Sequence, residues 1–249
     1  MCVQSWTLLT TGVQYRLCLS TSTSFPAPIL DALSGYFYLT RQLGFDPRNV
    51  VLMGDSSGGH LALCLSRYTA ELGLPHPGFI ALTSPLGDCG RSLPTRQSLK
   101  GIDILASNMD AKPLRSALRH YTPDAVKHPY FAPARAGPDA WSYLANTCAK
   151  VYIMVGTKEV LRDDGLGIVN GMKEAGVDVT LREVSYGPAA SSLAVICLLF
   201  YPLTPGRRWE SLWADGTVER VERLEPLVER SSPASSMTVR YRRMHLNRL

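Results

Sequence analysis

Residues 49–60, NVVLMGDSSGGH, constrain the fold more than any other part of the chain. The apolar run at 50–53 is rich in β-branched and long aliphatic side chains, which predicts a short buried strand. After the turn, apolar side chains recur at helical spacing, at Leu61, Cys64, Leu65, Tyr68 and Leu72. We therefore expect a strand, a sharp turn and a helix in direct succession.

The turn holds two serines, of which only Ser56 has glycine two positions before it and two positions after it, at Gly54 and Gly58. This G-x-S-x-G pattern between a strand and a helix is typical of the nucleophile elbow of serine hydrolases. Glycine lets strand and helix approach closely, and the positive end of the helix favours negative charge beside Ser56. A Gly- and Ser-rich loop between two core elements is the alternative.

Strand-type and helix-type patterns alternate along the chain. Apolar runs lie at 50–53, 79–83, 151–155 and 177–184, and helical patterns lie at 29–43, 59–72 and 164–175. This alternation predicts an α/β fold, with a mostly parallel sheet covered by helices on both faces. We expect one core over residues 1–203 and a charged, disordered or loosely packed tail over 204–249.

Composition excludes several classes of protein. With 249 residues, of which 45% are hydrophobic, the chain can bury one large core. The net charge of +5 is mild, and no concentrated basic face indicates nucleic-acid binding. The six cysteines have no C-x-x-C pair and no neighbouring histidines, so we expect no metal site.

Targeting signals are also weak. Residues 1–13 lack the basic start and apolar stretch of a signal peptide, and the apolar run at 193–203 is too short to cross a bilayer. These features predict a cytoplasmic protein. The run at 193–203 is either buried or a membrane-surface segment, and weak membrane contact through it and the arginine-rich tail is one hypothesis.

Three segments together resemble a known family. GDSSGG at 54–59 is similar to the G-D-S-A-G-G elbow of the hormone-sensitive-lipase-like branch of the α/β-hydrolases, especially its fungal members. YRL at 15–17, followed by FPAPILDAL at 25–33, and VYIMVGTKEVLRDD at 151–164 also resemble that family. The resemblance runs from about residue 13 to 184, so we expect an α/β-hydrolase fold truncated at its N-terminus and divergent after residue 184.

The resemblance implies a serine carboxylic-ester hydrolase that acts on small or lipid-like acyl esters without a metal or cofactor. Ser56 would be the nucleophile and the N–H of Ser57 an oxyanion donor. Glu159 matches the family's orienting acid, with Asp163 as the alternative. The remaining elbow positions are Gly54, Asp55, Gly58 and Gly59.

The base is not found where the family carries it. Residues 185–200 contain no histidine, and the family's His-Gly-Gly-Gly oxyanion loop does not precede the YRL segment. The chain's histidines are His60, His76, His120, His128 and His245, and only His245 follows the acid. We expect His60 either to have a packing role or to support the residues of the site from behind, without touching the substrate. The alternative function is therefore an impaired or non-catalytic remnant, or a truncated gene model, that binds a ligand or partner.

Overall fold

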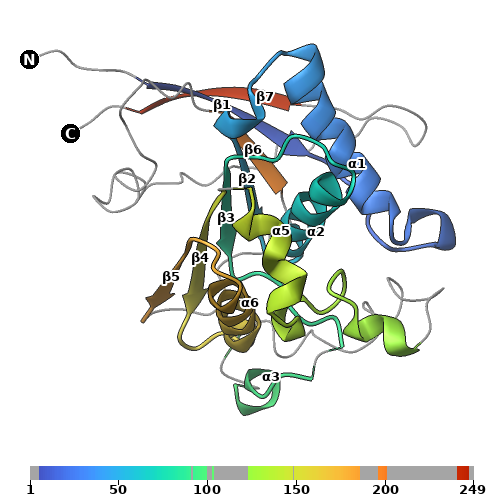
Figure 1. Ribbon diagram of the computed structural model, residues 1–249, viewed down its shortest axis with the longest axis vertical. Coiled ribbons are helices and arrows are strands. Elements are labelled where there is room, and N and C mark those ends of the chain that lie inside the picture. The colour runs from blue at the N-terminus through green and yellow to red at the C-terminus, as the bar shows by residue number, and fades with distance from the viewer. Residues whose placement is uncertain are drawn as a thin grey trace, which may run out of the picture.

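The protein is represented by a computed structural model, which describes residues 6–90, 92–99, 103, 123–147, 149–185, 196–200 and 240–246. The described strands form a seven-stranded sheet in the order β5-β4-β3-β2-β6-β1-β7. Figure 1 shows β1 and β7 at one end of this sheet and β5 at the other, with the helices beside it. The predicted α/β class is confirmed.

Four of the strands run parallel and follow the predicted apolar runs. They are β2 (Val50–Asp55), β3 (Phe79–Thr83), β4 (Lys150–Gly156) and β5 (Val179–Val184). Their pairing brings Asp55 beside Thr83 and Thr83 beside Met154. The carboxyl ends of β2, β3 and β4 therefore meet at one edge of the sheet, where the connecting loops carry the candidate site.

The other half of the sheet is antiparallel and was not predicted. β6 (Ile196–Phe200) pairs with both β2 and β1 (Trp6–Val13), and β7 (Arg240–Leu246) pairs with β1. β6 lies within the apolar run at 193–203, which accounts for its composition as an internal strand. β7 is a regular element within the segment expected to be a loose tail, and the boundary at residue 203 stays a prediction.

The three long described helices agree with the predicted patterns. They are α1 (Ala27–Phe37), which continues as a π-helix at Tyr38–Gln42, α2 (Ser57–Glu71) and α6 (Arg162–Glu174). Glycines with left-handed backbones follow two of them, Gly44 at φ +71° and Gly176 at φ +77°. Shorter helices are η1 (Thr21–Thr23), η3 (Pro47–Asn49), α3 (Thr95–Ser98), η4 (Pro123–Lys127), η5 (Pro133–Arg135), η6 (Pro138–Trp141) and α5 (Ser142–Ala145).

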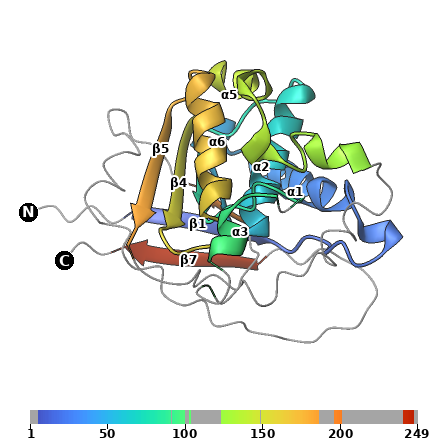
Figure 2. The same cartoon turned by 90° about the horizontal axis from the view of Figure 1, so that it is seen from below.

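The main core lies between the sheet and these helices. Alternate strand residues, such as Val50, Leu52 and Ile80, pack with α1, α2 and α6 in one cluster. The side chains of the neighbouring strand residues Val51 and Phe79 point to the other face of the sheet, where they belong to a separate buried cluster. All three long described helices lie on the first face (Figure 2), so the expected helical cover of the second face is not supplied by them.

Within the described residues, no helix combines the length and the apolar character needed to span a membrane.

Candidate active site

Ser56 occupies the single residue between β2 and α2, in a backbone conformation rare for a residue with a side chain. Its φ is +53° and its ψ is −120°. Non-glycine residues with positive φ are uncommon and strained, and such strain collects at functional sites. Three hydrogen bonds hold this conformation. The Ser56 N–H donates to Thr83 O at 3.0 Å, and Ser56 O accepts from Leu86 N at 3.0 Å and His60 N at 3.1 Å.

The elbow glycines are needed for the close approach of strand and helix. A Cβ atom on Gly54 would lie 2.6 Å from Gly59 N and closer still to the carbonyl group of Gly58. A Cβ on Gly59 would lie 3.1 Å from the Pro85 Cβ. The turn therefore excludes a side chain at Gly54, as expected from the sequence, and tolerates one poorly at Gly59.

Ser57 is the first residue of α2, so its backbone N–H has no carbonyl partner within the helix. Its hydroxyl forms a hydrogen bond with the side chain of Tyr15. Burial raises the pKa of Tyr15, the bond to Ser57 opposes that shift, and nearby Asp55 adds to it. Tyr15 thus links the segment before α1 to the start of α2, and it stays in its neutral, hydrogen-bonding form at neutral pH.

Glu159 lies in the loop after β4, and only 6% of its surface is exposed. Its Oε2 accepts a hydrogen bond from the Ser84 hydroxyl at 2.7 Å. The side chain folds over Gly156, where a Cβ would lie 2.9 Å from Glu159 Cδ. Because Ser84 directly follows Thr83, whose carbonyl holds Ser56, the carboxylate is placed next to the segment that fixes the elbow.

Asp163, the alternative acid, has another partner. Its Oδ2 accepts a hydrogen bond from the Thr95 backbone N–H at 3.0 Å. The neighbouring Asp164 is fully buried, and its Oδ1 accepts from the N–H groups of Gly87 and Asp88 at 2.7 and 2.8 Å. Both aspartates therefore fasten the segment after β3 to the start of α6.

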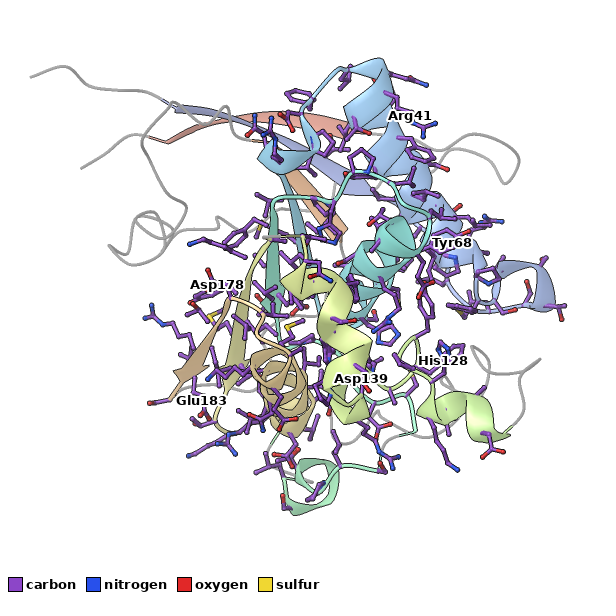
Figure 3. All side chains as sticks on the ribbon, viewed as in Figure 1. Arg41, Tyr68, His128, Asp139, Asp178 and Glu183 are labelled. Carbon is purple, nitrogen blue, oxygen red and sulfur yellow. The ribbon has the colours of Figure 1, made fainter. Side chains whose placement is uncertain are left out.

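The described histidine side chains are engaged elsewhere. His60 Nδ1 lies 2.8 Å from Leu86 O, and burial lowers the pKa of this ring. His76 Nε2 lies 2.8 Å from the Ser66 hydroxyl, and partial burial lowers the pKa of this ring as well. His128 stacks on Tyr130, and Figure 3 shows it on the side of the helices away from the sheet. No hydrogen bond joins the Ser56 hydroxyl to another described side chain.

The register of the sheet places His245 far from the elbow. His245 pairs with Thr7 on β1, and the β1–β6 and β6–β2 registers put Thr7 two residues before the row of Val50. Ser56 is six residues beyond Val50, so eight residues separate the two rows, roughly 26 Å along the strands. Three strand spacings add roughly 14 Å across the sheet. The backbone of His245 therefore lies far from that of Ser56, and His120 lies outside the described residues.

Sequence reasoning missed Tyr15 and Ser84 as members of the site. Tyr15 belongs to the YRL segment, so its nearness to the elbow could have been expected from the resemblance. Ser84 has no such signal, because its contact with Glu159 spans 75 residues of sequence. Only the parallel pairing of β3 with β4 brings the two together.

Among the described residues, no group of three or more His, Cys, Asp or Glu side chains is arranged to hold a metal ion. The cysteines described there, Cys18, Cys64 and Cys89, are free thiols. The elbow presents a hydroxyl and backbone N–H groups, and the Glu159 carboxylate is bonded to Ser84, next to the residue that holds the Ser56 N–H. A hydroxyl, N–H donors and a carboxylate are the groups that acyl transfer uses.

Comparison with known proteins gives consistent matches. A family model described as alpha/beta hydrolase fold matches residues 2–188. An acetyl-hydrolase of Streptomyces hygroscopicus is 30% identical over 159 residues, which are 64% of this chain and 50% of that protein. A solved esterase of the bacterial hormone-sensitive lipase family has a TM-score of 0.61 and 26% identity, covering 71% of this chain and 56% of the other.

A fungal structure is also similar. Carboxyl esterase 2 of the mycorrhizal fungus Tuber melanosporum has a TM-score of 0.55 at 23% identity, covering 69% of this chain and 55% of that one. At this identity the likeness extends to the fold alone. The chain spans about half the length of the curated relatives that it matches.

Proposed function

The chain belongs to the α/β-hydrolase fold family, and on that premise we propose that it is a serine carboxylic-ester hydrolase with Ser56 as its nucleophile. The observation that carries this proposal is the backbone of Ser56, with φ +53° and ψ −120° between a buried strand and a helix. A strained turn at this point directs the hydroxyl away from both elements. No other described position combines this geometry with a helix N-terminus.

In the proposed reaction, Ser56 Oγ forms a bond to the ester carbonyl carbon, and the carbonyl oxygen becomes an oxyanion. The Ser57 N–H, unpaired within α2, donates to that oxygen. Collapse of the tetrahedral intermediate breaks the bond to the alcohol oxygen, which leaves with the proton taken from Ser56, and an acyl-serine remains. Water then attacks the acyl carbon; its hydroxyl stays on that carbon as the carboxylic acid, and its proton returns to Ser56 Oγ as the acyl–serine bond breaks. The reaction needs no metal or organic cofactor.

Glu159 is proposed as the orienting acid. Its Oε2 is occupied by Ser84, while no described residue donates to Oε1. That oxygen can accept the N–H of an imidazole whose second nitrogen faces Ser56. Among the described residues no imidazole takes this place, so the group that accepts the Ser56 proton is to be sought outside them.

Small acyl esters are the proposed substrates. A relative that is 30% identical over 64% of the chain is named an acetyl-hydrolase, another is named an ethyl acetate hydrolase, and two more are named esterases. Acetylated or short-chain esters therefore come first as test compounds. The forms of the three motifs further lead us to propose that the chain is of the fungal type.

Hydrolysis of p-nitrophenyl acetate by the purified chain tests the proposal. We expect the wild type to exceed its Ser56→Ala variant by at least tenfold, with Ser57→Ala as the matched control that keeps the backbone N–H. Equal rates for wild type and Ser56→Ala would contradict the proposal. They would favour the alternative, in which the same site binds a ligand without turning it over.

A further inference from the structure

We propose that Ser84 is a positioning residue, whose hydroxyl holds the carboxylate of Glu159 in place beside the elbow. The role of Glu159 rests on the function proposed above, whereas the positioning itself is a property of the fold. Ser84 and Ser56 are the two non-glycine residues with positive φ among the described residues, at +43° and +53°. Two strained serines therefore lie at the carboxyl ends of adjacent strands.

The strain at Ser84 has a geometric consequence. Its N–H donates to Met154 O at 2.8 Å, which continues the pairing of β3 with β4 by one residue. Its hydroxyl donates to Glu159 Oε2 at 2.7 Å, and the residue is 99% buried, with 1% of its surface exposed. The backbone of Ser84 thus extends the strand pairing, while its side chain reaches the carboxylate of Glu159.

The segment around Ser84 also fixes the backbone of Ser56. The residue before Ser84, Thr83, accepts the Ser56 N–H at 3.0 Å, and Leu86 donates its N–H to Ser56 O at 3.0 Å. Both flanks of Ser84 are thus bonded to the elbow, while its side chain is bonded to Glu159. One short segment sets the position of the nucleophile and of the acid relative to each other.

A second set of contacts locks this segment to the loop that carries Glu159. Asp164 Oδ1 accepts from the N–H groups of Gly87 and Asp88 at 2.7 and 2.8 Å, entirely within the interior. Charge-assisted hydrogen bonds of this kind are short and strong. The loop after β3 therefore cannot move without the start of α6, and Ser84 stays opposite Glu159.

Glu159 needs this support because its side chain is longer and more mobile than that of an aspartate. It folds across Gly156, and a Cβ there would lie 3.0 Å from Oε1. The carboxyl group of Glu159 packs against the backbone of Gly156 on one side and accepts the Ser84 hydroxyl on the other. These two contacts restrict the carboxylate to one orientation. Without the hydroxyl, Oε2 loses the described donor that fixes it, and the carboxylate can rotate.

Two substitutions separate the hydroxyl from the backbone. Ser84→Ala removes the hydroxyl and keeps the strain, whereas Ser84→Gly removes the hydroxyl and relieves the strain. The first measurement is the infrared carboxylate stretch of Glu159, isolated as the difference between each protein and its Glu159→Gln counterpart. We expect the band to shift equally in both variants relative to the wild type. An unshifted band in either variant would overturn the proposal.

A thermodynamic cycle provides a second measurement that is independent of activity. Hydrogen bonds to charged groups are worth enough that Ser84→Ala should raise the unfolding equilibrium constant roughly tenfold to hundredfold. In the Glu159→Leu background, where the acceptor is absent, the same substitution should change it much less. Equal effects in the two backgrounds would mean that the Ser84 hydroxyl does not act through Glu159.

A kinetic measurement tests the esterase proposal and the role of Ser84 together, and its outcomes show which of the two is wrong. If both hold, Ser84→Ala and Ser84→Gly should each lower acylation of Ser56 by p-nitrophenyl acetate about tenfold. In the Glu159→Gln background neither should lower it further. If the Glu159 carboxylate band does not shift in the Ser84 variants, the role of Ser84 is refuted, whatever the hydrolysis rates are. A wild-type rate equal to that of Ser56→Ala would refute the esterase proposal while leaving the infrared result intact.

Discussion

Replacing Gly54 by alanine should prevent the elbow from closing. The added Cβ would lie 2.6 Å from Gly59 N and nearer still to the Gly58 carbonyl, whereas real Cβ contacts essentially never fall below 3.0 Å. Comfortable contacts of carbon are about 3.5 Å or longer, so β2 and α2 must separate by about 1 Å. The added Cβ is fixed to the backbone of β2, and the atoms it meets belong to the backbone of α2, so no side chain can rotate to relieve the clash.

Overpacking in a protein core lowers the free energy of unfolding by about 1–3 kcal/mol. Because the backbone cannot move aside as a side chain can, we expect a loss of about 3 kcal/mol for Gly54→Ala. For a chain of this size the melting temperature changes by about 2–4 °C per kcal/mol, so Gly54→Ala should lower it by roughly 6–12 °C. Thermal unfolding followed by circular dichroism measures this shift. The free energy of unfolding in urea should fall by the same 3 kcal/mol or so.

Gly137→Ala is the matched control for the same substitution. A Cβ on Gly137 meets no atom within 4 Å, and its φ of −68° suits any residue. Its stability should stay the same or rise by up to about 1 kcal/mol, since alanine restricts the unfolded chain. Equal melting temperatures for Gly54→Ala and Gly137→Ala would refute the close packing of strand and helix described above.

Three further predictions concern the surroundings of the elbow. Burial lowers the pKa values of His60 and His76, so the unfolded chain binds protons more readily, and the free energy of unfolding should fall as the pH drops below about 6.5. Urea titrations at several pH values test this, and His76→Gln should flatten the slope. Asp164→Ala leaves the N–H groups of Gly87 and Asp88 without their acceptor and should lower the free energy of unfolding in urea by roughly 3 kcal/mol. An unchanged urea midpoint would contradict the view that Asp164 fastens the loop after β3 to α6. Gly156→Ala should displace Glu159 and lower ester hydrolysis while changing stability by only about 1 kcal/mol; full activity would show that the carboxylate need not lie over Gly156.

The parts of the fold that sequence could predict are those with local signals. Hydrophobic periodicity gave the parallel strands and the three long helices, because each pattern lies within a single element. β6 and β7 were missed because antiparallel pairing with β1 joins segments that are distant in sequence. The sequence predicts that the apolar run at 193–203 is either buried or a membrane-surface segment. In the structure its strand β6 lies inside the sheet, between β2 and β1.

The candidate site follows the same division. Ser56, Ser57 and the elbow glycines could be identified from one motif, since they lie within six residues of sequence at 54–59. Glu159 came from resemblance, and its contact with Ser84 required the sheet register. Register also places the backbone of His245 far from Ser56, although His245 is the one histidine that follows Glu159 in the chain.

The most direct test of this account is the site of reaction with a fluorophosphonate, a reagent that modifies activated serines. After incubation of the folded chain, mass spectrometry of its peptides should locate the adduct on Ser56. Labelling should disappear in Ser56→Ala and persist in Ser57→Ala. An adduct on Ser57, or no adduct on folded protein under conditions that label an authentic esterase, would contradict the claim that Ser56 is an activated nucleophile.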